Sequence, residues 1–281
     1  MLLTRSLFLY GAASAALLPA LSSTFATLES KSGGRLGVYA MDGDGRTLAA
    51  YRSHERFPMC STFKVLAAGA VLSRVDGGNE RLDRAIHYTK ADLLEYAPIA
   101  SKHVARGEMS VGALCAAAVE YSDNTAANLL LASIGGPAAV TRFARSLGDS
   151  VTRLDRNEPS LNTAIPGDPR DTTTPAAMAN DVRAMTAGNA LSRASSALLV
   201  GWLQACVTGT DALRAGFPAG WAAGDKTGTG MNGTHNDVAI AWPPAKAGPI
   251  FVSAYLTGAS ESRDAMSATL AAVGKAVSST R

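Results

Sequence analysis

Two residues near the start of the chain have the types and spacing of a serine nucleophile and its base. Ser61 lies three residues before Lys64, and the stretch from Phe63 to Val75 is almost continuously apolar. This pattern predicts a buried helix that begins at Ser61 and places both side chains on one face, one turn apart. A lysine whose pKa is lowered by burial can accept the serine proton. The pair alone is a weak signal, because a helix-capping serine followed by a surface lysine has the same spacing.

A second segment, Ser122-Asp123-Asn124, follows an apolar run that ends at Ala118. The Ser122 hydroxyl could pass a proton to a leaving nitrogen, and the Asn124 side chain could hold an amide group of a substrate. Taken alone, the triplet fits the start of a helix better, because all three residue types cap helices.

A third segment, from Asp225 to Gly230, lies where we expect a strand to end. Lys226 and the hydroxyls of Thr227 and Thr229 could bind a carboxylate through charge-assisted hydrogen bonds. The glycines of this segment would let a substrate lie close to the strand backbone. A strand end followed by a turn is the alternative interpretation.

A fourth segment holds Glu158 and, four residues later, Asn162, in a stretch rich in Pro, Asn, Asp and Thr. A carboxylate and an amide at this spacing could hold and deprotonate a water molecule, although a lone loop glutamate usually does neither. Each of the two triplets is expected by chance about a few hundredths of a time in a chain of this length. Their order, with the glutamate between them, therefore predicts one active site built from all four segments.

Hydrophobic periodicity indicates the elements that must position these residues. Apolar runs at 36–41 and 47–51 flank an Asp/Gly turn and predict a β-hairpin. The middle of the chain, about 60–205, is rich in Ala and Leu with helical spacing. Further strands are expected at 221–225, 238–242 and 250–256, and a final helix at about 263–277.

These elements predict an α/β fold of the α+β type, in which an antiparallel five-stranded sheet is flanked by terminal helices and joined to an all-helical domain. We assign residues 27–58 and 208–281 to the sheet domain and residues 59–207 to the helical domain, with the catalytic loop at 156–171. A cleft between the two domains is the expected ligand site.

Residues 1–26 have the pattern of a secretory signal peptide, in which Arg5 precedes an apolar run that ends at Leu21 and is followed by small residues. A buried N-terminal helix is the alternative. We expect cleavage between Ala20 and Ala26, and hence a periplasmic or secreted protein without a membrane anchor.

Composition excludes other classes of function. The formal net charge is only +3, and no basic run with interleaved aromatic residues occurs, so nucleic-acid binding is not expected. The four histidines and three cysteines form no zinc-binding pattern, so we expect neither a metal nor a cofactor. The expected partner is a small-molecule substrate, and the expected state is a monomer.

The sequence resembles class A serine β-lactamases over nearly the whole chain after the signal segment. The resemblance rests on the S-x-x-K, S-D-N and K-T-G elements, on Glu95-Tyr96, and on residues 122–131 and 156–175. It implies a β-lactamase/transpeptidase-like fold and hydrolysis of the β-lactam amide bond of penicillins and cephalosporins through a serine acyl-enzyme. Antibiotic resistance would follow from that activity.

The resemblance also implies a role for each site residue. Ser61 would be acylated, Lys64 would be its proton partner, and Ser122 would protonate the leaving nitrogen. Glu158 with Asn162 would activate the deacylating water, and whether Lys64 or Glu158 is the acylation base stays open. The implied substrate-binding residues are Asn124, Asn162, Lys226, Thr227, Thr229, Tyr96 and His235. The remaining implied features are an oxyanion hole from the backbone amides of Ser61 and Thr229, and an Arg156–Asp171 ion pair that closes the loop.

Three positions depart from the family pattern. Some members of the family form a disulfide between the cysteine before the nucleophile and a cysteine after the K-T-G segment. Here the first position is Cys60 but the second is Gly230, so this disulfide is not expected. In other members the partner of Cys115 is a second cysteine, but that position is Ala68 here, so this disulfide is not expected either. Most members also place an arginine behind the carboxylate pocket, where this chain has His235. The two alternative positions for that arginine hold Ala212 and Ser267. We hypothesise that His235 partly fills the role; a histidine that only packs or is solvated is the alternative.

Three other functions share the Ser-x-x-Lys logic. A penicillin-binding D,D-peptidase has the same three motifs but no efficient deacylating base, so the Glu158/Asn162 pair disfavours it. A β-lactam sensor domain that stays acylated normally needs a membrane attachment. A serine-type glutaminase is disfavoured by the S-D-N and Glu158 segments.

Overall fold

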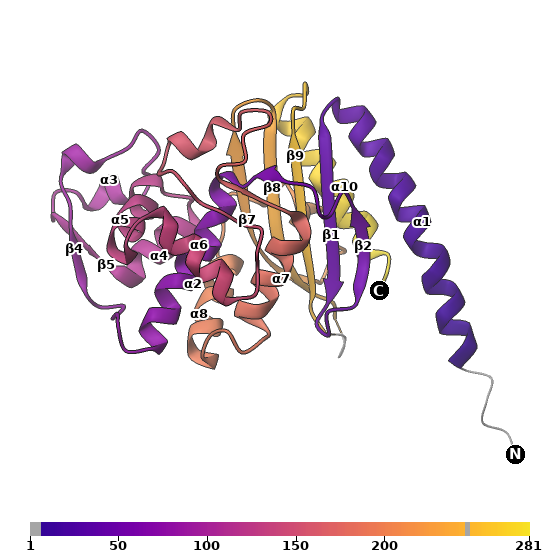
Figure 1. Ribbon diagram of the computed structural model, residues 1–281, viewed down its shortest axis with the longest axis horizontal. Helices are drawn as coiled ribbons and strands as arrows, with labels where there is room; N and C mark the ends of the chain where they lie inside the picture. Colours follow the sequence, from indigo (N-terminus) through magenta and orange to yellow (C-terminus); the bar gives the residue numbers. More distant parts are fainter. Residues whose placement is uncertain (1–6, 245–247) are drawn as a thin grey trace, which may run out of the picture.

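A five-stranded antiparallel sheet forms the centre of the molecule (Figure 1). The computed structural model describes residues 7–244 and 248–281. The strand order is β2-β1-β9-β8-β7, so the N-terminal hairpin pairs with the last strand of the chain. This arrangement confirms the predicted antiparallel five-stranded sheet. The strands are β1 (Arg35–Asp42), β2 (Thr47–Tyr51), β7 (Ala222–Gly230), β8 (Thr234–Trp242) and β9 (Ile250–Thr257).

The predicted hairpin is present and is fixed by its turn. The backbone amide of Gly45 donates to the Asp42 carbonyl at 2.9 Å, and the Asp42 side chain accepts from the amides of Asp44 and Arg46. Gly45 has φ +84°, a left-handed conformation that glycine adopts at little cost. The short Asp/Gly segment thus sets the register of β1 and β2.

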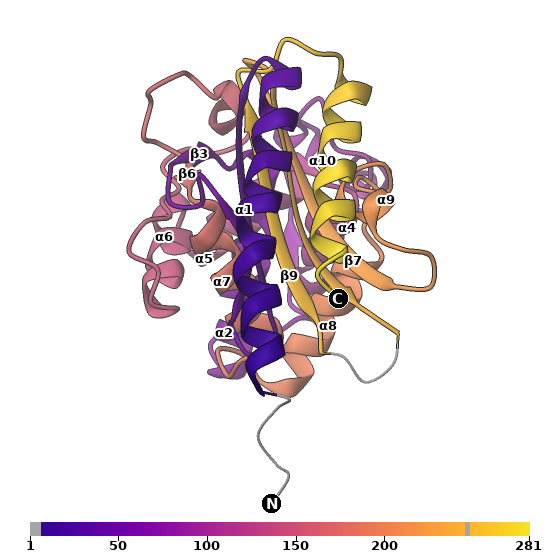
Figure 2. The same ribbon diagram turned by 90° about the vertical axis from the view of Figure 1, so that its right-hand side faces the viewer.

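Helices cover both faces of the sheet, so the central strands β8 and β9 are buried along almost their whole length. On the outer face, α1 (Leu7–Ser32) and α10 (Arg263–Ser278) lie side by side (Figure 2). The short helix α9 (Leu213–Gly216) packs against α10 on the same face. On the inner face, α7 (Pro175–Thr186) packs against β1 and β9.

The helical part is built around α2 (Phe63–Asp76), whose first ten residues are all buried. The other helices are α3 (Ala100–His103), α4 (Val111–Glu120), α5 (Asn124–Ile134), α6 (Pro137–Ser146) and α8 (Arg193–Gln204), with 3₁₀ turns η1 (Cys60–Thr62), η2 (Lys90–Asp92) and η3 (Ser160–Thr163). Two small ribbons pair β3 (Phe57–Pro58) with β6 (Thr172–Thr173), and β4 (Ala85–His87) with β5 (Glu108–Ser110).

The division into a sheet domain (27–58 and 208–281) and a helical domain (59–207) stays a prediction, and one of the two buried clusters extends across it. The larger cluster fills the helical part and the inner face of the sheet, and the smaller one lies between the outer face and the terminal helices. In the smaller cluster, Leu21 and Phe25 of α1 are buried. The signal segment expected for 1–26 therefore overlaps a packed helix, although its first six residues lie outside the described part of the chain.

Two local expectations need correction. The helix predicted from Ser61 begins at Phe63 instead, because residues 60–62 form the tighter turn η1. The strand that carries Lys226 continues to Gly230, because it pairs with β8 over its full length. Across the described residues, no helix combines the length and apolar character needed to cross a membrane.

Candidate active site

The turn η1 places Ser61 between the helical part and the edge of the sheet. Cys60 has φ +47°, and the Thr62 hydroxyl donates to the Met59 carbonyl at 2.9 Å, which together hold the turn before α2. Strand β7 is the edge strand next to η1. A Cβ at Gly228 would lie 2.6 Å from the Met59 carbonyl oxygen, so the close approach of strand and turn requires glycine there.

The Lys64 side chain is completely buried and lies among the other candidate catalytic groups. Its Nζ is 3.0 Å from Ser61 Oγ, 3.0 Å from Glu158 Oε1 and 3.3 Å from Ser122 Oγ. It also donates to the Ser122 carbonyl at 2.8 Å and to Asn124 Oδ1 at 2.6 Å. Burial lowers the pKa of Lys64, and the Glu158 carboxylate partly opposes that shift. A lysine in this setting can take a proton from the serine hydroxyl.

Ser122 is held on the opposite side of Lys64 by the cap of helix α5. Ser122 itself has φ +58°, an uncommon conformation for a residue with a side chain. The next residue, Asp123, caps α5 by accepting from the Ala126 amide at 2.8 Å, and its other oxygen accepts from the amides of Ile99 and Ala100. Asp123 thus holds its own loop, and the hydroxyl of Ser122 reaches the cleft.

Glu158 faces the same serine from the catalytic loop. Its Oε1 lies 3.4 Å from Ser61 Oγ, and its Oε2 accepts a short hydrogen bond from the Asn162 amide. The Asn128 side chain forms two hydrogen bonds with the Glu158 backbone. Its Oδ1 accepts from the Glu158 amide, and its Nδ2 donates to the Glu158 carbonyl, both at 2.9 Å. The carboxylate is therefore oriented from the backbone as well as from its side chain.

The ends of the loop 156–171 are tied together at Asp171, which is fully buried. Arg156 Nε donates to Asp171 Oδ2 at 2.5 Å, and Asp171 Oδ1 accepts from the amides of Asp155 and Arg156. This is the ion pair expected to close the loop.

The third wall of the cleft is strand β7. Lys226 is completely buried and donates to the Thr227 carbonyl at 2.9 Å. Burial lowers the pKa of Lys226 to about 8, and the positive charge of Lys64 acts in the same direction. The Thr227 hydroxyl exchanges a 2.6 Å hydrogen bond with the hydroxyl of Thr208, a residue that sequence reasoning missed.

A cleft of about 250 Å³ joins these groups. Tyr96, half-exposed, forms part of its wall. The structure thus brings the predicted residues from all four segments to one place. The residues that line the cleft are Ser61, Tyr96, Ser122, Asn124, Asn162, Thr208, Thr227, Thr229 and Arg263.

His235 lies behind this lining instead of in it. It is completely buried, with Nδ1 3.2 Å from Thr229 Oγ1 and Nε2 3.2 Å from Ser267 Oγ. Burial lowers the pKa of His235 to about 4, helped by the positive charge of Arg263, so the ring is neutral at pH 7. A neutral ring carries no positive charge, which argues against the hypothesis that His235 partly fills the role of the arginine and favours the alternative of a histidine that packs.

Arg263 is the cationic side chain that the cleft does contain, and sequence reasoning missed it. It is the first residue of α10, one helical turn before Ser267, the residue considered as an alternative arginine position. Because residues four apart share a helix face, the register of α10 could have pointed to it.

The three cysteines are buried and unpaired. A Cβ at Gly230 would lie 2.6 Å from Cys60 Sγ, which shows that these two positions do face each other. Among the residues that the structure describes, no group of three or more His, Cys, Asp or Glu side chains could hold a metal ion. Fold and cleft together define an enzyme with a serine nucleophile.

Comparisons with known proteins agree on the family. A model of the β-lactamase enzyme family matches residues 20–280. β-Lactamase CTX-M-97 of Escherichia coli is 50% identical over 250 residues, which are 89% of this chain and 85% of that one. β-Lactamase OXY-1 of Klebsiella oxytoca is 47% identical over 258 residues, which are 92% of this chain and 88% of that one.

Solved structures similar to this chain identify the class within the family. The putative class A β-lactamase PenP of Rhodopseudomonas palustris has a TM-score of 0.91 and 57% identity, with 93% of this chain and 100% of that chain covered. The ancestral (GNCA) class A β-lactamase has a TM-score of 0.89 and 59% identity, with 92% and 98% covered. The chain belongs to the β-lactamase enzyme family, and within it to the class A serine β-lactamases.

Proposed function

We propose that Ser61 opens the β-lactam ring by attack of Oγ on the amide carbonyl carbon. The serine proton passes to Lys64 Nζ, which lies 3.0 Å away and whose pKa is lowered by burial. The backbone amides of Ser61 and Thr229 stabilise the oxyanion, since both residues lie where η1 meets the edge strand β7. When the carbon–nitrogen bond breaks, the Ser122 hydroxyl protonates the nitrogen and is reprotonated from Lys64, 3.3 Å away.

The ester on Ser61 is then hydrolysed by a water that Glu158 and Asn162 hold and deprotonate. The water oxygen attacks the ester carbonyl, the proton moves to Glu158, and Ser61 leaves with a proton returned to its oxygen. One observation carries this proposal: the Glu158 carboxylate lies 3.4 Å from Ser61 Oγ and is oriented by Asn162 and by the backbone clamp of Asn128. A protein that only becomes acylated has no need of this arrangement.

The carboxylate of the substrate binds to the hydroxyls of Thr227 and Thr229, next to the positive charge of Lys226. Arg263, on the cleft wall, supplies the second cation. His235 acts through Thr229, because its Nδ1 lies 3.2 Å from that hydroxyl and its ring is neutral at pH 7. Tyr96 and Asn124 line the part of the cleft that receives the acylamino side chain.

Turnover of a chromogenic cephalosporin tests the reaction. The protein should hydrolyse hundreds of molecules per active site, and Ser61→Ala should abolish the reaction. Glu158→Gln keeps the size of the side chain and the contact with Asn162 but removes the base, so it should lower deacylation by about 10²–10⁴-fold. Intact-protein mass spectrometry should then show the acyl-enzyme as the main species.

Two outcomes would contradict this assignment. A single stoichiometric burst from the unaltered protein would indicate a binding protein or a D,D-peptidase. Fast turnover by Glu158→Gln would remove the carboxylate from the deacylation step. Asn189→Ala, at an exposed position after α7 and outside the cleft lining, is the control and should form no lasting acyl-enzyme.

We also propose that the protein acts as a monomer after export, and that hydrolysis of penicillins and cephalosporins confers resistance on the producing cell. The basic start and short apolar run of the N-terminal segment support export.

A further inference from the structure

A second cavity, of about 450 Å³, lies behind the catalytic loop 156–171. It shares no lining residue with the catalytic cleft. Its walls come from the loop 164–169, from the start of β1 and from the end of β9. The volume lies within the usual range of small-molecule sites.

The cavity wall carries an arginine, Arg56, that forms no ion pair with any residue that the structure describes. Arg56 donates from Nη1 to the Val151 carbonyl at 2.9 Å and to the Thr172 hydroxyl at 3.0 Å, and none of the ion pairs found in the described residues includes it. The acid in the wall, Asp168, is paired with Arg170 at 2.8 Å. The net charge presented by these groups therefore favours an anion.

A second arginine in the wall is held in one orientation. The guanidinium of Arg35 lies 3.9 Å from the centre of the Phe57 ring, donates to the Arg56 carbonyl at 2.7 Å and pairs with Glu55 at 3.0 Å. An arginine fixed in this way presents a flat face on which an aromatic ring can stack.

The rest of the wall is apolar. Ile165 is a large aliphatic residue that is 47% exposed, and Pro58, Pro166 and Pro169 line the same cavity. A ligand that fits must therefore combine an anionic group with a flat apolar body.

We propose that this cavity is a binding site for a small aromatic carboxylate. The carboxylate binds Arg56, the ring lies against Arg35 and Ile165, and occupancy stabilises the closed loop. The stabilisation follows because the ligand binds only when residues 164–169 are in place, so binding shifts the loop toward that state.

The same residues connect the cavity to the catalytic cleft. Ala164, in the cavity wall, is two residues from Asn162, which contacts Glu158. Asn232, on the turn after β7, donates to the carbonyls of Thr163 at 2.9 Å and Ala164 at 3.3 Å. A ligand that contacts Ala164 would therefore press on a loop segment whose backbone carbonyls are already held by Asn232.

Calorimetric titration of the whole protein with 2-naphthoate tests the site. We expect saturable one-to-one binding, and at least tenfold weaker binding of the uncharged 2-naphthylmethanol. Ile165→Asp places a negative charge at the rim of the cavity and should weaken naphthoate at least tenfold. Leu198→Asp, at a similarly exposed position on α8, is the control and should not change the affinity.

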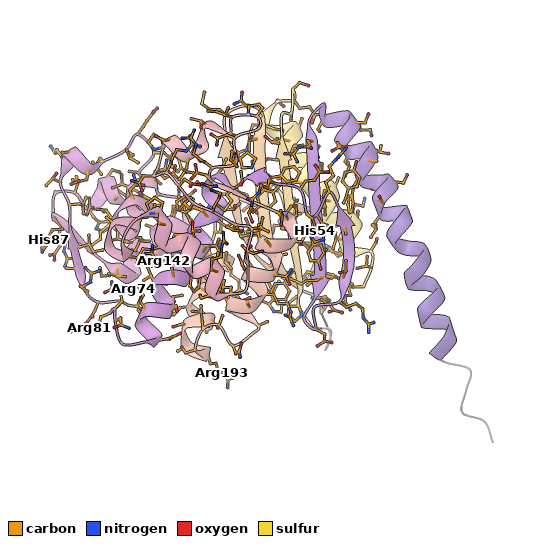
Figure 3. All side chains as sticks on the ribbon, in the orientation of Figure 1. His54, Arg74, Arg81, His87, Arg142 and Arg193 are labelled. Atoms are coloured by element: carbon orange, nitrogen blue, oxygen red, sulfur yellow. The ribbon has the colours of Figure 1, made fainter. Side chains whose placement is uncertain are left out.

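Arginine variants separate this cavity from the catalytic cleft. Arg56→Gln should weaken binding at least tenfold, whereas Arg193→Gln, at the foot of the helical part (Figure 3), should not. Arg263→Gln should also leave the affinity unchanged; loss of binding there would place naphthoate in the catalytic cleft and overturn the proposal.

Hydrogen exchange provides the second measurement. Naphthoate should slow exchange in peptides covering residues 160–172, and Ile165→Asp should abolish that protection. Absence of saturable binding, or binding that neither Ile165→Asp nor Arg56→Gln weakens, would contradict the site. Binding and exchange are both measured without a β-lactam, so neither depends on the proposed catalytic cycle.

Discussion

At the scale of single residues, the carboxylate end of the cleft departs most from the expected pattern. The sequence supported the hypothesis that His235 partly fills the role of the missing arginine, with a histidine that only packs as the alternative. The structure buries this ring between Thr229 and Ser267, and burial lowers its pKa to about 4. Arg263 instead reaches the cleft from the first turn of α10. We therefore propose that a residue at a helix start supplies the positive charge and that the histidine orients a threonine hydroxyl.

A pair of substitutions distinguishes these two roles. Arg263→Gln should raise KM about tenfold for a penicillin with a free carboxylate and lower kcat much less, because it removes a charge-assisted contact. His235→Ala should raise KM less and should not alter the pH dependence of kcat/KM between pH 5 and 8. An unchanged KM in Arg263→Gln, with a tenfold increase in His235→Ala, would return the cation role to the histidine.

The pKa of Lys226 predicts an alkaline limit to activity. This pKa is lowered to about 8 by burial, and only the protonated form attracts the substrate carboxylate. As the pH rises through 8 the cationic fraction of the free enzyme falls, so kcat/KM should fall by up to tenfold per pH unit above that point. Lys226→Arg keeps its charge at every pH used and should remove this alkaline limb. If kcat/KM of Lys226→Arg still fell above pH 8, the alkaline fall would be due to a group other than Lys226.

At the scale of elements, two segments hold features that periodicity does not reveal. The loop 156–171 has no regular pattern, yet it is fixed at its ends by Arg156 and Asp171 and near its start by Asn128, which contacts the backbone of Glu158. Helix α1 is the second segment. Its sequence has the composition of a signal peptide, but the last turns of the helix pack in the folded core.

The packing of α1 predicts where the signal segment is removed. Phe25 is completely buried, Leu21 nearly so, and Glu29 forms an ion pair with Arg52 at 2.7 Å. Cleavage after Ala26 would remove both apolar side chains and cost about 3 kcal/mol or more of folding free energy. We therefore expect cleavage before Leu21.

Mass spectrometry of the exported protein gives the new N-terminus directly. In parallel, a chain that starts at residue 27 should unfold at a clearly lower temperature than one that starts at residue 21. Within the longer chain, Phe25→Ala should lower the unfolding temperature more than Phe25→Leu. Equal stability of the two chains would show that the helix before residue 27 is dispensable.

At the scale of the whole molecule, the fold class, the hairpin and the last helix could be predicted from periodicity, because each depends on residues close in sequence. Ser61, Lys64, Ser122, Glu158 and Lys226 could be predicted as one site from their motifs. Thr208 could not, because it reaches the cleft only through packing between distant elements, and Arg263 could have been found only from the face that α10 turns to the cleft. The strand order beyond the hairpin was equally inaccessible, since no local pattern records how the other strands pair.

The pairing of β1 with β9 joins residues 35–42 to residues 250–257. A ribosome has therefore made almost the whole chain before the hairpin at its start meets the strand that completes its sheet. Until then strand β1 has β2 on one edge and no partner on the other, so the long-range pairing of β1 with β9 must form late. We therefore expect the sheet, and with it the cleft along its edge strand, to be completed only near the end of synthesis.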